Sequence, residues 1–96
     1  MNVIARRTLQ AFWTLHPQAK NPLAAWYRVT RRQRWTSFAD LRATFNSADQ
    51  VGGKVVFNIG GNNYRLVGLV AYRTQRVFVI WIGTHAEYDR INVADL

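Results

Sequence analysis

The sequence predicts one α+β domain spanning residues 1–96. In this prediction an N-terminal strand and two to three helices pack on an antiparallel β-sheet that ends in a three-stranded meander. The chain is long enough for one hydrophobic core and too short for a second. Apolar residues recur at helical spacing in the first half, and after residue 53 they follow the pattern of strands and tight turns. The hydrophobic content of 49% excludes a disordered chain.

The chain opens with a short strand and two helices. Residues 1–4 predict the strand, which leads directly into the first helix. Between residues 5 and 16 large apolar side chains follow helical spacing, and Pro17 ends this helix because proline cannot continue the hydrogen-bond pattern. Asn21 followed by Pro22 predicts the start of the second helix, with Asn21 as its N-cap and proline at the first helical position.

The second helix has an apolar face and a basic face. The apolar face consists of Leu23, Trp26, Tyr27 and Thr30. The basic face consists of Arg28, Arg31 and Arg32. Charged residues opposite an apolar face are often no more than a solvated surface. Two interpretations therefore stay open for these arginines: a solvated face, or a stripe that binds a partner.

A third helix and three strands complete the fold. Residues 37–45 open with Ser-x-x-Asp, which resembles a capping box and predicts a short helix, and residues 46–53 form a polar loop. Strand patterns follow at residues 54–59, 64–72 and 77–82. The turn between the first two strands is rich in glycine and asparagine, which favours a hairpin. These strands are apolar on both faces, so we expect the sheet to be largely covered.

The charge of the chain points to an acidic partner. Thirteen lysines and arginines against five acids give a net charge of +8, and only Lys20 and Lys54 are lysines. Such a field attracts polyanions, and arginine forks onto phosphate and stacks on bases, which favours nucleic acid over a membrane surface. The chain has no cysteine, which excludes disulfides and thiolate metal sites. No apolar run approaches the roughly 18–20 residues that span a bilayer, so we expect a cytoplasmic protein.

Histidine and glutamate are scarce in this chain, yet both occur in the octapeptide at residues 82–89, where the last strand ends. Residues 84–87, Thr-His-Ala-Glu, have the form of a capping box and predict a short helical turn. On such a turn His85, Tyr88 and Asp89 share one face. A neutral imidazole at His85 can accept a proton, which suits a general base. The alternative is a hydrogen-bonded structural histidine, and this is the interpretation that we adopt for His16.

Arg65 is unusual because it falls in the middle of an apolar strand. A cation at such a position is either paired with a carboxylate or directed at an anionic ligand. With only five acids in the chain, the anionic ligand is the favoured interpretation.

Two segments carry a resemblance to a known family. They are VVFNIGGNNYRLVGLVAY at residues 55–72 and VFVIWIGTHAEYDRI at residues 77–91. Together they resemble the HigB-type toxins of bacterial toxin–antitoxin pairs, in the RelE/ParE superfamily. The resemblance implies a RelE-like fold and an mRNA interferase that cleaves mRNA on the translating ribosome and so inhibits translation. It further implies an endoribonuclease that works without metal or cofactor, through the 2′-hydroxyl of the RNA. The first half of the chain matches in layout alone.

The resemblance also implies partners and site residues. The partners are mRNA, the ribosome and a HigA-type antitoxin with a helix-turn-helix fold, through which alone operator DNA would be bound. The expected catalytic residues are His85 as the base, Arg65 as the phosphate clamp, and Tyr88 as a proton donor or a stacking partner for a base. The expected RNA-binding residues are Lys54, Asn58, Arg73 and Arg76, although Asn58 could instead support the adjacent turn. The expected antitoxin-binding residues are Arg28, Arg31 and Arg32.

Two other functions remain open at this level. One is a non-catalytic module that binds RNA or the ribosome, in which the octapeptide is only a strand end and a cap. The other is a ParE-like inhibitor of DNA gyrase, against which a candidate base in the octapeptide argues. The binding module predicts binding without cleavage and little change in a His85→Ala variant, whereas the ParE-like interpretation predicts inhibition of gyrase.

Overall fold

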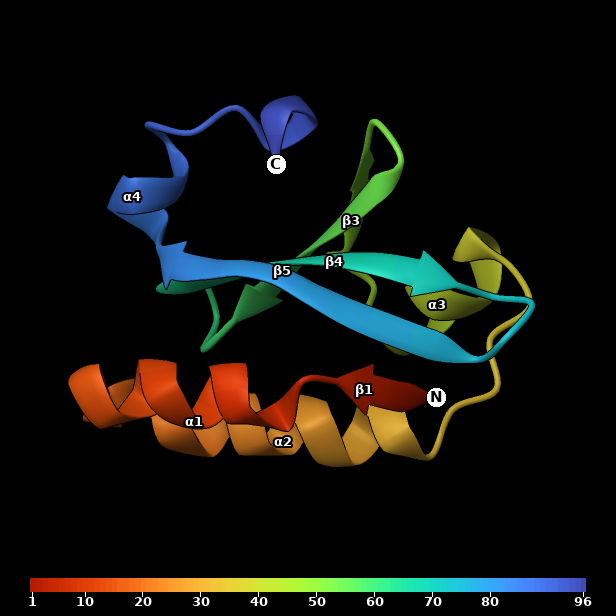
Figure 1. The fold of residues 1–96 in the computed structure, drawn as a ribbon, viewed down its shortest axis with the longest axis horizontal. Coiled ribbons are helices and arrows are strands. Elements are labelled where there is room, and N and C mark those ends of the chain that lie inside the picture. Colours follow the sequence, from red (N-terminus) through yellow and green to blue (C-terminus); the bar gives the residue numbers. More distant parts are fainter.

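The structure is a computed structural model that describes residues 1–96, and it contains one five-stranded mixed sheet with four α-helices. Figure 1 shows α1 and α2 side by side on one side of the sheet, with α4 and the C-terminal segment on the other. The strands are β1 (Asn2–Ile4), β2 (Asp49–Val51), β3 (Lys54–Ile59), β4 (Tyr64–Ala71) and β5 (Arg76–Thr84). The α-helices are α1 (Arg6–Leu15), α2 (Lys20–Arg31), α3 (Phe38–Thr44) and α4 (His85–Tyr88), and short 3-10 helices lie at Pro17–Ala19 and Val93–Asp95.

The strand order is β1–β5–β4–β3–β2. The predicted meander of β3, β4 and β5 is confirmed, and so is the N-terminal strand. The sheet is not purely antiparallel, however, because β1 runs parallel to β5, with Asn2 beside Arg76. The prediction of an antiparallel sheet was therefore wrong at this edge. Nothing in a three-residue strand specifies its neighbour, and the helices between β1 and the meander allow the parallel crossover.

Two local predictions in the first half were also wrong. The segment predicted as a loop at residues 46–53 contains β2, which pairs with β3 through a tight glycine turn. This strand has one apolar residue, Val51, so it lacks an alternating pattern. Asn21 is not an N-cap, since α2 already begins at Lys20. The 3-10 helix before it starts with a hydrogen bond from the Ala19 amide to the His16 carbonyl, 2.9 Å, and the chain continues into α2 without a break.

The main core lies between the sheet and the helices α1, α2 and α3. Aromatic rings fill its centre: Phe57 of β3 packs edge-on against Trp26 at 5.2 Å and against Phe45 at 5.6 Å between ring centroids. Leucines from each of these helices are fully buried against the strands. The periodic apolar positions of the first half therefore do what helical spacing predicts, which is to cover one face of the sheet.

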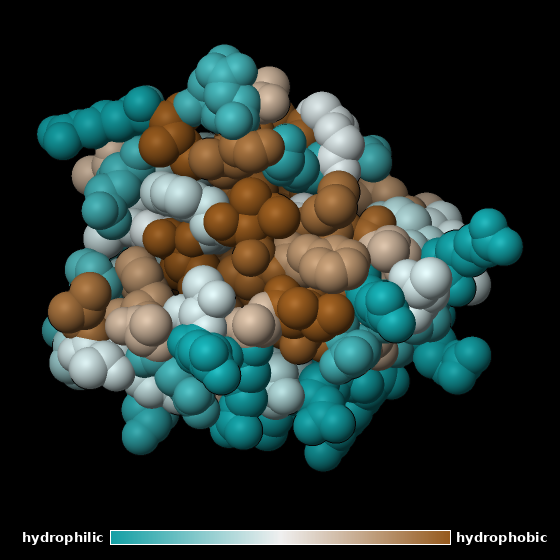
Figure 2. Space-filling view, in the orientation of Figure 1, coloured by the Kyte–Doolittle hydropathy of each residue, from teal (hydrophilic) through white to brown (hydrophobic).

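The second face of the sheet is covered only in part. Val56, Val67 and Val93 are buried there, with Tyr88 and Ile91 of the C-terminal segment packed against them. Figure 2 shows hydrophobic side chains gathered in the middle of the molecule and hydrophilic ones along its border, most densely over α1 and α2. None of the helices has both the length and the apolar character that crossing a membrane requires.

Candidate active site at the end of the last strand

The turn between β3 and β4 helps to position two of the predicted catalytic residues, His85 and Arg65. Gly60 and Gly61 both have positive φ, +62° and +67°, a conformation that glycine adopts without steric cost. On the far side of this turn the carbonyl of Asn63 accepts a hydrogen bond of 2.9 Å from the backbone amide of His85. The side chain of Arg65 bonds back to the same turn. The glycine-rich turn therefore fixes the positions of His85 and Arg65 through hydrogen bonds.

The helical turn α4 begins with the predicted capping box. The Thr84 hydroxyl accepts a hydrogen bond from the Glu87 amide at 3.1 Å, and the Glu87 carboxylate accepts one from the Thr84 amide at 2.8 Å. The bond from the Thr84 backbone amide, reinforced by the Thr84 hydroxyl, lowers the pKa of Glu87 below its ordinary 4.5. The prediction that Thr84 and Glu87 cap this turn is confirmed.

His85 and Asp89 form a close pair. The Nδ1 atom of His85 lies 3.1 Å from a carboxylate oxygen of Asp89, one helical turn later. Their convergence on one face of α4 follows from their i, i+4 spacing. The His85 side chain is 40% exposed, so the ring is accessible to a ligand. The carboxylate fixes the ring by holding Nδ1, which is the arrangement that leaves Nε2 free to accept a proton.

Arg65 is buried and tied to the backbone. Only 8% of the residue is exposed. Its Nη1 donates to the carbonyls of Tyr64 and Asn62 at 3.1 and 3.4 Å, and its Nη2 donates to the Asn62 side-chain oxygen at 2.6 Å. No carboxylate pairs with it, as the scarcity of acids predicted; the single close contact between a basic side chain and a carboxylate in this chain is that of His85 with Asp89. The charge of Arg65 is thus positioned by neutral oxygens and left uncompensated.

Tyr88 lies between Arg65 and an aromatic residue that the sequence did not single out. The Arg65 guanidinium sits 5.8 Å from the centre of the Tyr88 ring, a cation–π distance. The centre of the Trp81 ring lies 6.2 Å from the centre of the Tyr88 ring. Trp81 folds over Gly83, which pairs with Arg65 in register, and any side chain at position 83 would collide with it. Glycine at 83 is what lets the tryptophan close over the site.

The sequence analysis missed two side chains of this site, Asn62 and Trp81, and recognised a third, Asp89, only in part. Asp89 was recognisable from its spacing to His85. Asn62 was not, because its bond to Arg65 depends on how the turn folds. Trp81 could not be distinguished from the other apolar residues of its strand, because alternation does not show that its ring lies over Gly83. Asp89 and Asn62 bind the candidate base and the candidate phosphate clamp, whereas Trp81 packs against Tyr88.

The predicted RNA-binding residues are spread over the sheet. Asn58 is exposed and pairs with Arg65 across β3 and β4, so it borders the site. Lys54 lies on the same face but four residues earlier, about 13 Å away at about 3.3 Å per residue. Arg73 and Arg76 lie at the β4–β5 turn. Arg76 is eight residues from the end of β5, about 26 Å by the same measure, so neither arginine lies close to His85.

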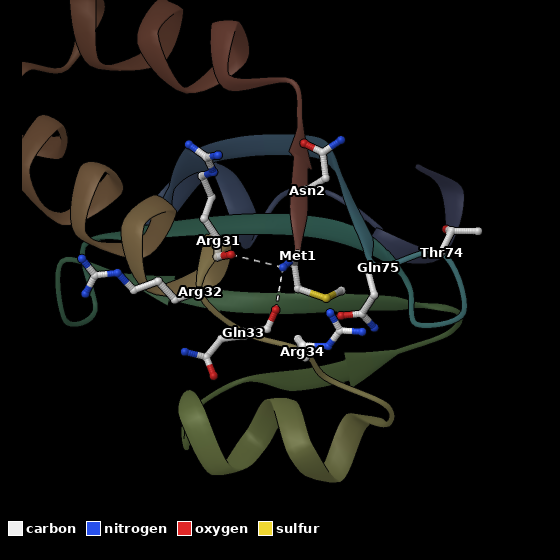
Figure 3. A pocket seen from close by; sticks show the side chains of 8 residues that line it. All are labelled: Met1, Asn2, Arg31, Arg32, Gln33, Arg34, Thr74 and Gln75. Atoms are coloured by element: carbon white, nitrogen blue, oxygen red, sulfur yellow. Dashed lines mark hydrogen bonds between the residues drawn. The ribbon is translucent and has the colours of Figure 1, made fainter.

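The predicted antitoxin-binding arginines belong to this opposite, basic end. Arg31 and Arg32 border an open depression of about 490 Å³ that also contains Arg34 and two residues of the β4–β5 turn, Thr74 and Gln75. Figure 3 shows the side chains of Arg31 and Arg32 pointing in different directions around Met1, whose amino group donates to the Gln33 carbonyl at 2.6 Å. Because these guanidinium groups diverge, the surface suits an extended acidic partner better than one small anion.

Arg28 continues the basic surface along α2. It borders a second depression with Tyr27, Arg31 and Arg32. Arg6 and Arg31 both lie over the Tyr27 ring, at 5.2 and 5.6 Å from its centre. Cation–π contacts with Tyr27 thus place Arg6 and Arg31 on one surface, with no carboxylate between them.

His16 lies near the candidate active site as well. Its ring stacks on Phe12 at 4.4 Å and meets Tyr64 edge-on at 6.3 Å. Its ring nitrogens form no hydrogen bond within the chain, so the packing part of the structural interpretation is confirmed and the hydrogen-bonded part is not. His16 is also one of the lesser causes that lower the pKa of Glu87.

Comparison with known proteins identifies the class. The sequence profile described as HigB toxin, RelE-like toxic component of a toxin–antitoxin system, matches residues 19–91. The mRNA interferase toxin HigB of Escherichia coli strain K12 is 30% identical over 92 residues, which cover 93% of this chain and 88% of that protein. The mRNA interferase HigB of Shigella flexneri gives the same values. That of E. coli O6:H1 strain CFT073 is 27% identical over 94 residues, covering 95% of this chain and 91% of that protein.

The sheet, its terminal site and these matches define the toxic component of a toxin–antitoxin system. Within that class, the chain belongs to the HigB toxin family. The match extends well into the helical half, where the sequence alone offered only a similar layout. A toxin of this kind has an antitoxin partner.

Proposed function

We propose that this chain is an mRNA interferase, an endoribonuclease that cleaves mRNA on translating ribosomes in the cytoplasm and so inhibits translation. The observation that carries the proposal is the His85–Asp89 pair beside the buried charge of Arg65. The relatives named mRNA interferase support the same activity. The RelE-like arrangement of the fold is part of the proposal, with the α1–α2 pair on one face and the reaction at the end of β5.

The proposed reaction uses the 2′-hydroxyl of the RNA as the nucleophile. His85 Nε2 takes the proton of that hydroxyl while Asp89 holds Nδ1. The oxygen attacks the adjacent phosphorus, the bond to the 5′-oxygen breaks, and a 2′,3′-cyclic phosphate remains on the upstream fragment. Arg65 stabilises the charge that builds up on the phosphorus-bound oxygens. The departing 5′-oxygen takes a proton from Tyr88, or from solvent if the Tyr88 ring serves to stack a base.

The nucleophile belongs to the substrate, so the reaction does not depend on an activated water. The residues on the page supply a base, a cation and a proton donor, which together cover each charge change of this step. No group of three or more His, Asp or Glu side chains gathers in a metal-binding arrangement. We propose that side chains alone carry the reaction, because the nucleophile is a hydroxyl of the substrate itself.

RNA contacts beyond the reacting phosphate fall to the exposed polar residues of the sheet. Asn58 borders the site and would contact the nucleotide next to the cleaved bond. Lys54 lies further along the same face. Arg73 and Arg76, at the far turn, would bind a more distant part of the mRNA or of the ribosome, because strand β5 separates them from His85.

The partner is proposed to be a HigA-type antitoxin with a helix-turn-helix fold. The toxin would contact operator DNA only through this antitoxin. Its acidic residues would face Arg28, Arg31 and Arg32. The support is the divergent, uncompensated arginine surface at the end of α2. Electrostatic attraction of this kind speeds encounter more than it strengthens the final complex.

The test is expression of the chain alone in bacteria. We expect growth arrest and new mRNA 5′ ends, mapped by sequencing, which a His85→Ala variant expressed at the same level does not produce. Intact transcripts in arrested cells would remove the nuclease assignment. Loss of gyrase supercoiling activity in place of RNA cleavage would favour a ParE-like inhibitor, and arrest by the His85→Ala variant would favour a module that only binds.

A further inference from the structure

A pocket lies between helices α1 and α2, on the side of the sheet opposite α4 (Figure 1). Its volume is about 260 Å³. Small-molecule sites usually measure about 300–1,000 Å³, so this pocket suits a small ligand. The lining combines apolar or aromatic side chains with basic ones: Leu9, Trp13, Ala24 and Tyr27, together with Arg6, Arg28 and Arg31. The proposed cleavage reaction uses none of them.

Two of these arginines share one aromatic ring. The guanidinium carbons of Arg6 and Arg31 lie 5.2 and 5.6 Å from the centre of the Tyr27 ring, both within the cation–π range of about 6 Å. The ring attracts each guanidinium group, but the two groups repel each other because they carry the same charge. Arg28 adds a third positive charge to the lining, one helical turn from Arg31. A bound anion would offset this repulsion.

No acidic side chain compensates these charges. The first 39 residues contain seven basic residues and no acidic one. The single close contact between a basic side chain and a carboxylate joins His85 to Asp89, in the C-terminal segment. At the start of α1 the N-cap residue, Ala5, forms no side-chain hydrogen bond, and the first turn carries no acid. The positive end of this helix dipole therefore adds to the charge of Arg6.

We infer that this pocket binds a nucleoside monophosphate, with the phosphate between Arg6 and Arg31 and the base against Trp13. Arginine suits the phosphate, because its forked donors match two phosphate oxygens and form charge-assisted hydrogen bonds. Aromatic side chains and guanidinium planes suit the base, because both stack on flat rings. The two kinds of lining residue thus correspond to the two halves of a nucleotide.

Other occupants use only part of this lining. An inorganic anion would bind the arginines and leave the apolar wall at Leu9, Trp13 and Ala24 without a contact. An acidic peptide offers carboxylates but does not require an aromatic wall. A phosphate monoester carries a charge of about −1.5 to −2 at pH 7, whereas each phosphodiester inside a nucleic acid strand carries a single charge. Three arginines around so small a pocket therefore favour a mononucleotide over a longer strand.

The first experiment compares three ligands by calorimetry with the wild-type chain. Adenosine 5′-monophosphate should bind at least about 10-fold more tightly than inorganic phosphate or adenosine, because each of these lacks either the base or the charge. Inorganic phosphate that binds as tightly as the nucleotide would make the pocket a simple anion site. Adenosine that binds as tightly would show that the arginines are not used. Either result, or no binding of the nucleotide, overturns the inference.

The second experiment tests the position of the phosphate. Arg6→Gln should weaken binding of adenosine 5′-monophosphate at least about 10-fold, the effect of losing a hydrogen bond to a charged group. Arg7→Gln is the matched control: it removes the same charge from the next residue of α1, which is also exposed but does not line the pocket, and it should bind as wild type does. Thermal melting establishes that both variants are folded. An equal loss in both variants, or no loss in either, would contradict the inference.

The third experiment locates the base by NMR. The indole N–H signal of Trp13, assigned with a Trp13→Phe variant, should shift when adenosine 5′-monophosphate is added and stay in place when inorganic phosphate is added. If the nucleotide leaves the Trp13 signal unchanged, the base lies elsewhere and the inference is wrong.

A nucleic acid strand is the last ligand to compare. A short 2′-O-methyl RNA without terminal phosphates has no free 2′-hydroxyl, so the proposed reaction cannot cleave it. If it binds more tightly than adenosine 5′-monophosphate and loses this affinity in Arg6→Gln, the pocket belongs to RNA and the inference is wrong. None of these measurements involves cleavage, so the inference and the proposed nuclease activity can fail independently.

Discussion

His85 depends on Asp89, one helical turn away, for its orientation. We predict that His85→Ala slows single-turnover cleavage of ribosome-bound mRNA by roughly 100-fold or more, the usual contribution of a general base. The melting curve should stay close to wild type, because the ring is partly exposed and makes only this one side-chain bond. Asp89→Asn should slow cleavage less, since the base remains but the amide no longer holds the correct tautomer. Wild-type rates in His85→Ala would place the base elsewhere.

Arg65 combines a structural role with the proposed chemical one. It is buried and donates three hydrogen bonds, two to Asn62 in the β3–β4 turn and one to the carbonyl of Tyr64, which the sequence did not reveal. We predict that Arg65→Ala lowers the free energy of unfolding by about 1–3 kcal/mol, the cost of leaving buried groups unpaired. Cleavage by the folded variant should fall by about 100- to 1000-fold, the usual effect of losing one charge-stabilising donor.

The control for Arg65 is Asn62→Ala, which removes one partner and keeps the charge. It should lower stability while leaving most of the cleavage rate, measured in single turnover below the melting temperature. A folded Arg65→Ala variant that cleaves normally would make Arg65 a purely structural residue. An Asn62→Ala variant as slow as Arg65→Ala would show that position matters as much as charge.

At the scale of the element, helix α4 is stabilised by its capping box more than by its own backbone hydrogen bonds. A helix of four residues is too short to be stable by itself. We predict that Thr84→Ala and Glu87→Ala each lower the free energy of unfolding by about 0.5–2 kcal/mol through lost capping. Chemical denaturation measures this. The cleavage step should remain nearly intact in folded protein, and a large loss of rate would assign Glu87 to the chemistry.

The same cap should make the chain less stable in acid. Hydrogen bonds to Thr84 lower the pKa of Glu87 below 4.5 in the folded state. A lowered folded pKa means that the stabilisation is present in full above the ordinary pKa and is lost as the pH falls through the folded value. Urea midpoints measured from pH 6 downwards should therefore decrease less in Glu87→Gln than in wild type. Parallel curves would show that the cap contributes no pH dependence.

At the scale of the whole molecule, charge is divided between two ends. The end with the candidate site has His85, Arg65 and two of the five acids, whereas the opposite end collects arginines from α2 and the β4–β5 turn. We predict that the association rate with the antitoxin falls steeply between low and high salt, because the surface acts through long-range attraction. Replacing Arg28, Arg31 and Arg32 by glutamine should flatten this dependence. A rate that salt does not change would contradict the electrostatic account.

The sequence by itself determined the local features. The capping box of α4, the pairing of His85 with Asp89, the hairpin of β3 and β4 and the apolar faces of α1 and α2 all depend on residues a few positions apart. Such contacts are fixed by helical and strand periodicity and by glycine at positive φ, so the pattern is sufficient to predict them. The family resemblance was likewise carried by residues close together in the chain.

Only the tertiary structure decided which of these features meet. Two pairings join distant parts of the chain: that of β1 with β5, which is parallel, and that of β2 with β3. Register and packing against a shared core set these contacts, and a short strand such as Asp49–Val51 has too few apolar residues to specify its partner. Burial of Arg65 followed from the same packing, which the alternation of its strand could not reveal.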